Sequence, residues 1–110
     1  MNVSEIIKSI KENKAEKHEL VFVHEQTGKI YAPVIIRNNE VKQVINQDAY
    51  TPENEHLFAK ITMGQFAEHL QNNCHQNANV WVDCNIEECK IIQAVDMIEP
   101  DNSCFMISPA

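Results

Sequence analysis

The cysteine residues are the side chains best suited to chemistry in this 110-residue chain, and all four lie in its second half. No two of them form a C-x-x-C pair, so their spacing indicates neither a zinc ribbon nor a thioredoxin-like redox motif. Cys74, His75, Cys84 and Cys89 nevertheless offer thiolate and imidazole ligands of the kind that Zn²⁺ prefers. Because Cys84 and Cys89 would face each other across a hairpin, these four residues are a candidate metal site.

A simpler interpretation of the cysteines is structural. Free cysteine is among the most frequently buried residue types and packs as a small hydrophobic side chain. In this interpretation Cys84 and Cys104 are buried, while Cys74 and Cys89 have no function. We favour it over the metal site and expect no bound cofactor.

Trp81, the only tryptophan, is the strongest candidate for a binding residue. It lies between two valines in a strand-like run, so its side chain points to the opposite face from theirs. If the valines line the core, Trp81 faces outward among Asp83, Glu87 and Glu88, where a large aromatic side chain is a typical binding hot spot. The open alternative is that Trp81 lies beneath a helix or loop.

Other catalytic patterns are missing from the sequence. The only glycines are Gly28 and Gly64, too few for a P-loop or a Rossmann fingerprint. No H-E-x-x-H motif occurs, and a cysteine nucleophile would need His18, His24 or His56 brought to it by the fold. We therefore expect a protein that is not an enzyme.

The charge of the chain is unevenly distributed. Residues 1–60 carry nine acidic and eight basic side chains, whereas residues 61–110 carry seven acidic ones and a single base, Lys90. Binding to phosphate backbones requires clustered lysine and arginine, so the second half disfavours direct nucleic-acid binding. No apolar run is long enough to span a membrane, and the first residues do not resemble a secretory signal, so we expect a cytoplasmic protein.

Two stretches have the pattern of an amphipathic helix behind a capping box, and they lie 60 positions apart. Residues 2–5 (Asn-Val-Ser-Glu) and 62–65 (Thr-Met-Gly-Gln) both have the capping-box pattern. Behind each, apolar residues recur at i, i+3, i+4 and i+7 and form one apolar face. The two faces consist of Val3, Ile6, Ile7 and Ile10, and of Met63, Phe66, Ala67 and Leu70. Both helices are expected to end at an asparagine, near Asn13 and Asn73.

Short runs rich in β-branched and aromatic residues follow each helix and predict strands. They are residues 19–23, 30–36 and 41–45 in the first half, and 79–83, 90–98 and 104–107 in the second. Gly28 predicts a hairpin turn, and Pro33 predicts an edge or a bulge. Further turns are expected at 38–39, 85–88 and 100–102.

Each half therefore reads as an α-β-β-β unit, too small to be stable alone. We expect one α+β domain, 1–110, made of two pseudo-repeated halves (1–45 and 61–107) joined by a polar linker, 46–60. Antiparallel sheets packed by the two amphipathic helices would complete it. Chance similarity stays open, because a capped helix followed by a hairpin is a common arrangement.

The second half also resembles short phage and prophage proteins that combine a "T-hydrophobic-G-x-hydrophobic" helix start with an "A-x-V-x-V" strand and a β-hairpin. The residues 62–66 match the helix start, and Ala78, Val80 and Val82 match the strand. The match spans roughly 45 residues of common α+β pattern. It departs at the turn, where Glu87 and Glu88 replace the usual glycine. The resemblance implies an α+β fold and a mobile-element origin, and carries over no catalytic residue.

The leading functional hypothesis is a small non-enzymatic module that binds another protein, with homodimer formation left open. The first alternative is an acidic inhibitor or mimic that binds a basic nucleic-acid-processing protein, since the second half is acidic. The second alternative is a small metal-binding protein that uses the Cys/His set. Neither direct nucleic-acid binding nor a membrane is expected.

Overall fold

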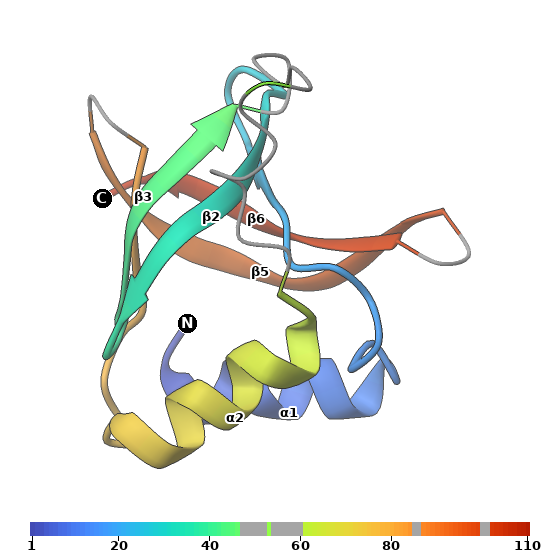
Figure 1. Cartoon of the computed structure of the whole chain (residues 1–110), viewed down its shortest axis with the longest axis vertical. Coiled ribbons are helices and arrows are strands. Elements are labelled where there is room, and N and C mark those ends of the chain that lie inside the picture. Colours follow the sequence, from blue (N-terminus) through green and yellow to red (C-terminus); the bar gives the residue numbers. More distant parts are fainter. Residues whose placement is uncertain (47–52, 54–60, 85–86, 100–101) are drawn as a thin grey trace.

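The structure is a computed structural model that describes residues 1–46, 53, 61–84, 87–99 and 102–110. In this part of the chain two helices lie against each other on one side of a curved set of strands (Figure 1). The elements follow the order α1 Val3–Glu12, β1 Phe22–His24, β2 Ile30–Arg37, β3 Glu40–Asn46, α2 Met63–Asn73, β4 Trp81–Asp83, β5 Glu88–Glu99 and β6 Asn102–Pro109. The α+β class expected from the sequence is confirmed.

Both helices begin where the capping boxes predict. The side chain of Asn2 accepts a hydrogen bond from the N–H of Glu5, whose carboxylate accepts one from the N–H of Asn2. Thr62 and Gln65 form the same pair of bonds at the start of α2. Two otherwise unpaired donors are thus satisfied at each helix start. The helix ends also lie close to prediction, with Asn13 and Cys74 as the C-caps.

The predicted apolar faces are the buried faces. All four predicted residues of α2 are buried, and so are three of the four in α1. Ile7 is the exception and is only partly buried. The core also contains the aromatic rings of Phe22, Phe66 and Phe105, whose centroids lie 6.4–6.5 Å apart. Because these rings come from β1, α2 and β6, the core joins both halves of the chain.

Local strand geometry follows the turn and bulge signals. Gly28 has φ +70° in the β1–β2 turn, where glycine meets little steric cost. Asn38, in the turn before β3, has φ +53°. The β2–β3 register shifts immediately after Pro33, which confirms the predicted irregularity. The predicted turn at 85–88 and the turn at 100–102 lie partly, and the linker 46–60 lies mostly, outside the described residues.

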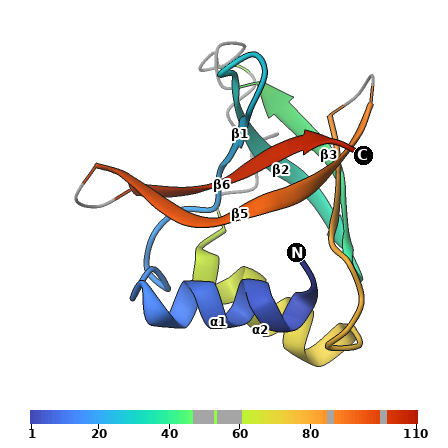
Figure 2. The ribbon, with the colours of Figure 1, turned by 180° about the vertical axis from the view of Figure 1, so that it is seen from behind.

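The sheet is mixed, which corrects the expectation of purely antiparallel sheets. Antiparallel hairpins join β1 to β2, β2 to β3, β4 to β5 and β5 to β6. Two parallel pairs, β1–β6 and β3–β4, connect the two hairpin sets and close a barrel in the order β1-β2-β3-β4-β5-β6. Figure 2 shows β1 beside β6 from behind. The parallel pairs join strands far apart in sequence, and alternation patterns give no information on such partners.

Each helix start is bound to the segment that follows the other helix. Val3 N–H donates to Ala78 O (2.9 Å), and Met63 N–H donates to His18 O (2.7 Å). One residue further on, Ser4 N–H donates to Gln76 O (3.0 Å) and Gly64 N–H donates to Glu16 O (2.9 Å). Every donor and acceptor in one bond lies 60 positions from its counterpart in the other. These exchanged bonds satisfy helix N–H groups that the capping boxes leave unpaired.

No helix in the described part of the chain is long and apolar enough to cross a membrane.

Gly64 is packed so closely against the backbone of Glu16 that a larger residue has no room. A Cβ at position 64 would lie 2.8 Å from Glu16 O and 3.1 Å from Glu16 Cβ. We expect Gly64→Ala to destabilise the fold by about 1–3 kcal/mol, less a gain of up to about 1 kcal/mol in helix propensity. Chemical denaturation measures this change. Ser4→Ala, at the equivalent position of α1, is the control and should shift stability by no more than about 0.5 kcal/mol. Equal stability of the two variants would contradict the close contact.

The Thr62 cap gives a second measurable contribution. Thr62→Ala removes the acceptor for the Gln65 N–H and should cost about 1 kcal/mol of unfolding free energy. Thr62→Ser keeps the hydroxyl group and should retain most of that stability. A Thr62→Ser variant as unstable as Thr62→Ala would assign the loss to the methyl group instead of the cap.

Candidate functional site

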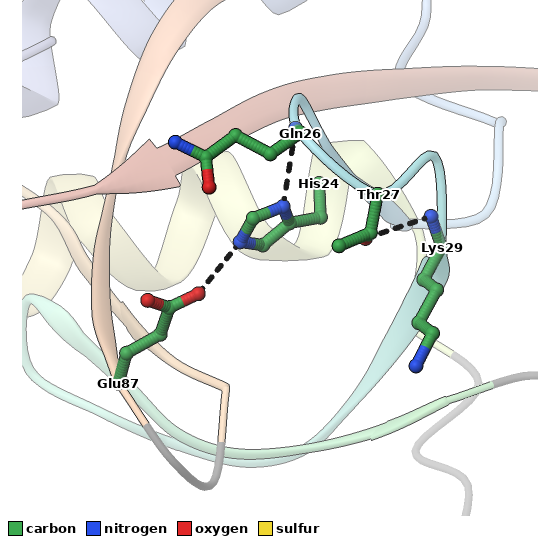
Figure 3. Close-up of polar contacts among 5 residues, drawn as sticks. All are labelled: His24, Gln26, Thr27, Lys29 and Glu87. Carbon is green, nitrogen blue, oxygen red and sulfur yellow. Dashed lines mark hydrogen bonds and ion pairs between the residues drawn. The ribbon is translucent and has the colours of Figure 1, made fainter.

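A histidine and a glutamate meet where the end of β1 lies beside the start of β5 (Figure 3). His24, the last residue of β1, is only 3% exposed. Its Nε2 lies 2.7 Å from Oε1 of Glu87, which is half-buried one residue before β5. The two residues are 63 positions apart in the chain. They meet because β1 pairs with β6 in the same barrel that contains the β4–β5 hairpin.

The protonation pattern of His24 follows from its second contact. The backbone N–H of Gln26 donates to Nδ1 at 3.2 Å. Because Nδ1 accepts this bond, the proton of the neutral ring lies on Nε2, which then donates to Glu87. Both nitrogens of this buried ring are therefore satisfied.

Two cysteines lie next to this pair. Cys84 follows β4 and Cys89 lies in β5, and their thiols are hydrogen-bonded to each other. The Nε2 or Nδ1 of His24, a carboxylate oxygen of Glu87 and Sγ of Cys89 all lie within 4.8 Å of one another. We call His24, Cys84, Glu87 and Cys89 the thiol–imidazole cluster.

Burial keeps the thiols of this cluster in their protonated form. Burial raises the pKa of Cys84 strongly, and the hydrogen bond to Cys89 raises it further. Burial also raises the pKa of Cys89. The phenol of Tyr31, in β2, has a raised pKa because of its own burial and the nearby cluster. At neutral pH the cluster thus holds uncharged thiols beside the His24–Glu87 pair.

The structure brings together only part of the metal site predicted from the sequence. Cys84 and Cys89 lie side by side, as expected for a hairpin. Cys74 is the C-cap of α2, and His75 is exposed in the next turn, where Nδ1 accepts the N–H of Asn77. Among the described residues, the one group of three or more potential ligands contains neither of them, but His24, Glu87 and Cys89 instead.

The predicted binding residues divide between two places. Val82 and its partner Cys89 are buried, so the alternate residues of β4 and β5 face outward. Trp81 is partly buried on this outer face, opposite Lys90 of β5 and beside Glu40 of β3. Asp83 and Glu88 are exposed and directly opposite each other on the same face. Trp81, Asp83, Glu88 and their neighbours Glu40 and Lys90 form what we call the Trp81 face.

Glu87, the fourth predicted binding residue, is directed to His24 instead of this outer face. The sequence reasoning missed its partner, because His24 is separated from the cysteines by most of the chain. The one available signal was that a Cys–His site would need a histidine brought in by the fold. No feature of the sequence indicated that Tyr31 would lie near these residues.

Comparison with known proteins gives no relative for this chain: no protein-family model, no curated protein and no solved structure matches it.

The thiols should differ in reactivity according to their burial. Cys74 is half-buried, whereas Cys84, Cys89 and Cys104 are at most 4% exposed. A thiol-specific reagent acts on accessible thiolate, so we expect Cys74 to react first and the other thiols at least tenfold more slowly in the folded protein. Because burial raises the pKa of Cys74 as well as that of Cys84 and Cys89, the reaction of all three thiols should accelerate as pH rises. Disulfide-exchange kinetics followed by absorbance test this. Cys74→Ser should remove the fast phase, and a fast phase that persists in this variant would contradict the assignment.

Proposed function

We propose that this protein is a small non-enzymatic interaction module that binds a basic protein surface through the Trp81 face. The observation that carries the proposal is a partly buried tryptophan among charged side chains on the outer face of β3, β4 and β5. Binding hot spots commonly consist of such an aromatic anchor inside a polar rim.

The core gives no reason for a tryptophan at this position. Its neighbours Val80 and Val82 fill the interior and are at most 1% exposed. Trp81 lies on the opposite face of the strand and is not fully buried. Covering this ring by a partner would remove apolar surface from water, which is favourable by about 25 cal/mol per Å².

The charges around Trp81 favour a basic partner. Asp83 and Glu88 are opposite each other across the β4–β5 pair, where like charges are destabilising. Glu40 adds a third carboxylate beside Trp81, and Lys90 is the one base of the Trp81 face. A partner surface carrying lysine or arginine would be attracted to these carboxylates. The inhibitor hypothesis is the case in which that partner processes nucleic acid.

The exchanged hydrogen bonds support a second part of the proposal, that the halves descend from one duplicated α-β-β-β unit. Matching bonds recur at a constant offset of 60 positions at both helix starts. The same offset relates the isolated bridges Asn2–Asn79 and Glu19–Thr62. The second half alone resembles short phage proteins, which agrees with one α-β-β-β unit having been the ancestral protein.

Site-specific photo-crosslinking tests the binding face directly. A photo-reactive phenylalanine analogue at position 81 should crosslink a partner in an extract of the cells that make the protein. The same analogue at Glu12, an exposed residue of α1, is the control and should give no such product. Equal crosslinking from both positions, or none from position 81, would overturn the proposed face.

The captured partner then allows a quantitative test. Trp81→Ala should weaken binding at least about 30-fold, as expected for a hot spot worth about 2 kcal/mol. Asp83→Asn with Glu88→Gln should weaken binding mainly at low salt, because salt screens exposed charges. If neither Trp81→Ala nor the Asp83→Asn, Glu88→Gln double variant weakened binding, the interface would lie elsewhere. A crosslinked product of twice the chain mass would identify a second copy of this chain as the partner.

A further inference from the structure

We propose that the thiol–imidazole cluster, made of His24, Cys84, Glu87 and Cys89, is a binding site for one zinc ion. This site is separate from the Trp81 face and does not depend on the interaction proposed there. It also differs from the ligand set read from the sequence, because His24 and Glu87 take the places of Cys74 and His75.

The spacing of the cluster suits a tetrahedral ion. Zinc binds sulfur at about 2.3 Å and nitrogen or oxygen at about 2.0–2.2 Å, so neighbouring ligand atoms lie about 3.3–3.8 Å apart. In the structure the ligand atoms of His24, Glu87 and Cys89 already lie within 4.8 Å of one another. The 2.7 Å His24–Glu87 contact would only need to open by about 1 Å to take its place in this geometry.

Cys84 is the fourth ligand that we assign; it is not one of the three residues whose ligand atoms already lie within 4.8 Å of one another, so its thiol has to move toward the ion. Its thiol is hydrogen-bonded to that of Cys89, which places the two sulfur atoms next to each other. Two thiolates, one imidazole and one carboxylate form a ligand set of the kind that zinc accepts. Each thiol gives its proton to solvent when it binds the ion.

Most of the cluster is buried. His24, Cys84 and Cys89 are each at most 4% exposed, so water is largely excluded. Glu87 is the exception, since 37% of its side chain is exposed. Among these four residues, Glu87 is therefore the one through which an ion from solvent would first be bound.

Ion binding should change the tautomer of His24, that is, which ring nitrogen carries the proton. Coordination by Nε2 requires the ring proton on Nδ1, where the N–H of Gln26 now donates at 3.2 Å. This hydrogen bond is at the long end of the normal range and belongs to an exposed turn, so it is the contact that gives way. Zinc should therefore shift the amide resonance of Gln26 although Gln26 is not a ligand.

Titration with Co²⁺, a spectroscopic substitute for zinc, tests the site in the full-length reduced protein. We expect thiolate-to-cobalt charge-transfer absorption and intense visible bands of tetrahedral Co²⁺, saturating at one ion per chain. Zn²⁺ should displace the cobalt and raise the midpoint of thermal unfolding. A titration without charge-transfer absorption would overturn the proposal.

Matched variants locate the ion. Cys89→Ser and His24→Gln should each weaken Co²⁺ binding at least 100-fold, whereas Cys74→Ser and Cys104→Ser should bind as the parent does. Circular dichroism of the ion-free variants tests whether they are folded, and Glu87→Gln, which keeps the size of the side chain, should weaken binding about tenfold without loss of fold. Binding that is lost in Cys74→Ser and kept in Cys89→Ser would place the ion elsewhere and refute the cluster. Trp81→Ala should leave the titration unchanged, so failure of one proposal is distinguishable from failure of the other.

Discussion

The structure depends on satisfying the first backbone N–H groups of its two helices. Capping boxes pair some of these groups, and the segment after the opposite helix accepts the next ones. Since each helix start is bound to the chain that leads out of the other, neither helix can move without breaking bonds at both. This exchange fixes the path into β1 and β4, and through these strands the position of His24, Trp81 and Cys84.

The features that are local in sequence were predictable, and those that depend on distant partners were not. Asn2 and Thr62 begin helices because the bonds that cap a helix are made within four residues. The apolar faces and Gly28 follow from equally local rules of periodicity and backbone conformation. No local sequence pattern predicts the parallel pairing of β1 with β6, because the two strands are about 80 residues apart in the chain and meet only in the folded barrel.

The same distinction applies to the sites. Trp81 could be assigned to an outer face because its valine neighbours alternate with it, and Asp83 shares that face for the same reason. Cys84 and Cys89 meet because a hairpin joins them. The approach of His24 to Glu87 could not be derived, since it requires knowing which strand ends coincide around the barrel. A cluster built from both halves is visible only after the barrel has closed.

The closure of β1 against β6 has a consequence for synthesis of the chain. Phe22 pairs with Phe105, so the first strand of the barrel must wait until more than 80 further residues have left the ribosome. Contacts between such distant residues bear the cost of closing a long loop before they contribute any stability, which slows folding. The first half therefore emerges without the acceptors for the N–H groups of Val3 and Ser4, and with the apolar face of α1 uncovered. The barrel closes only after β6 has been synthesised, and until then the nascent protein is most exposed to aggregation and to chaperones.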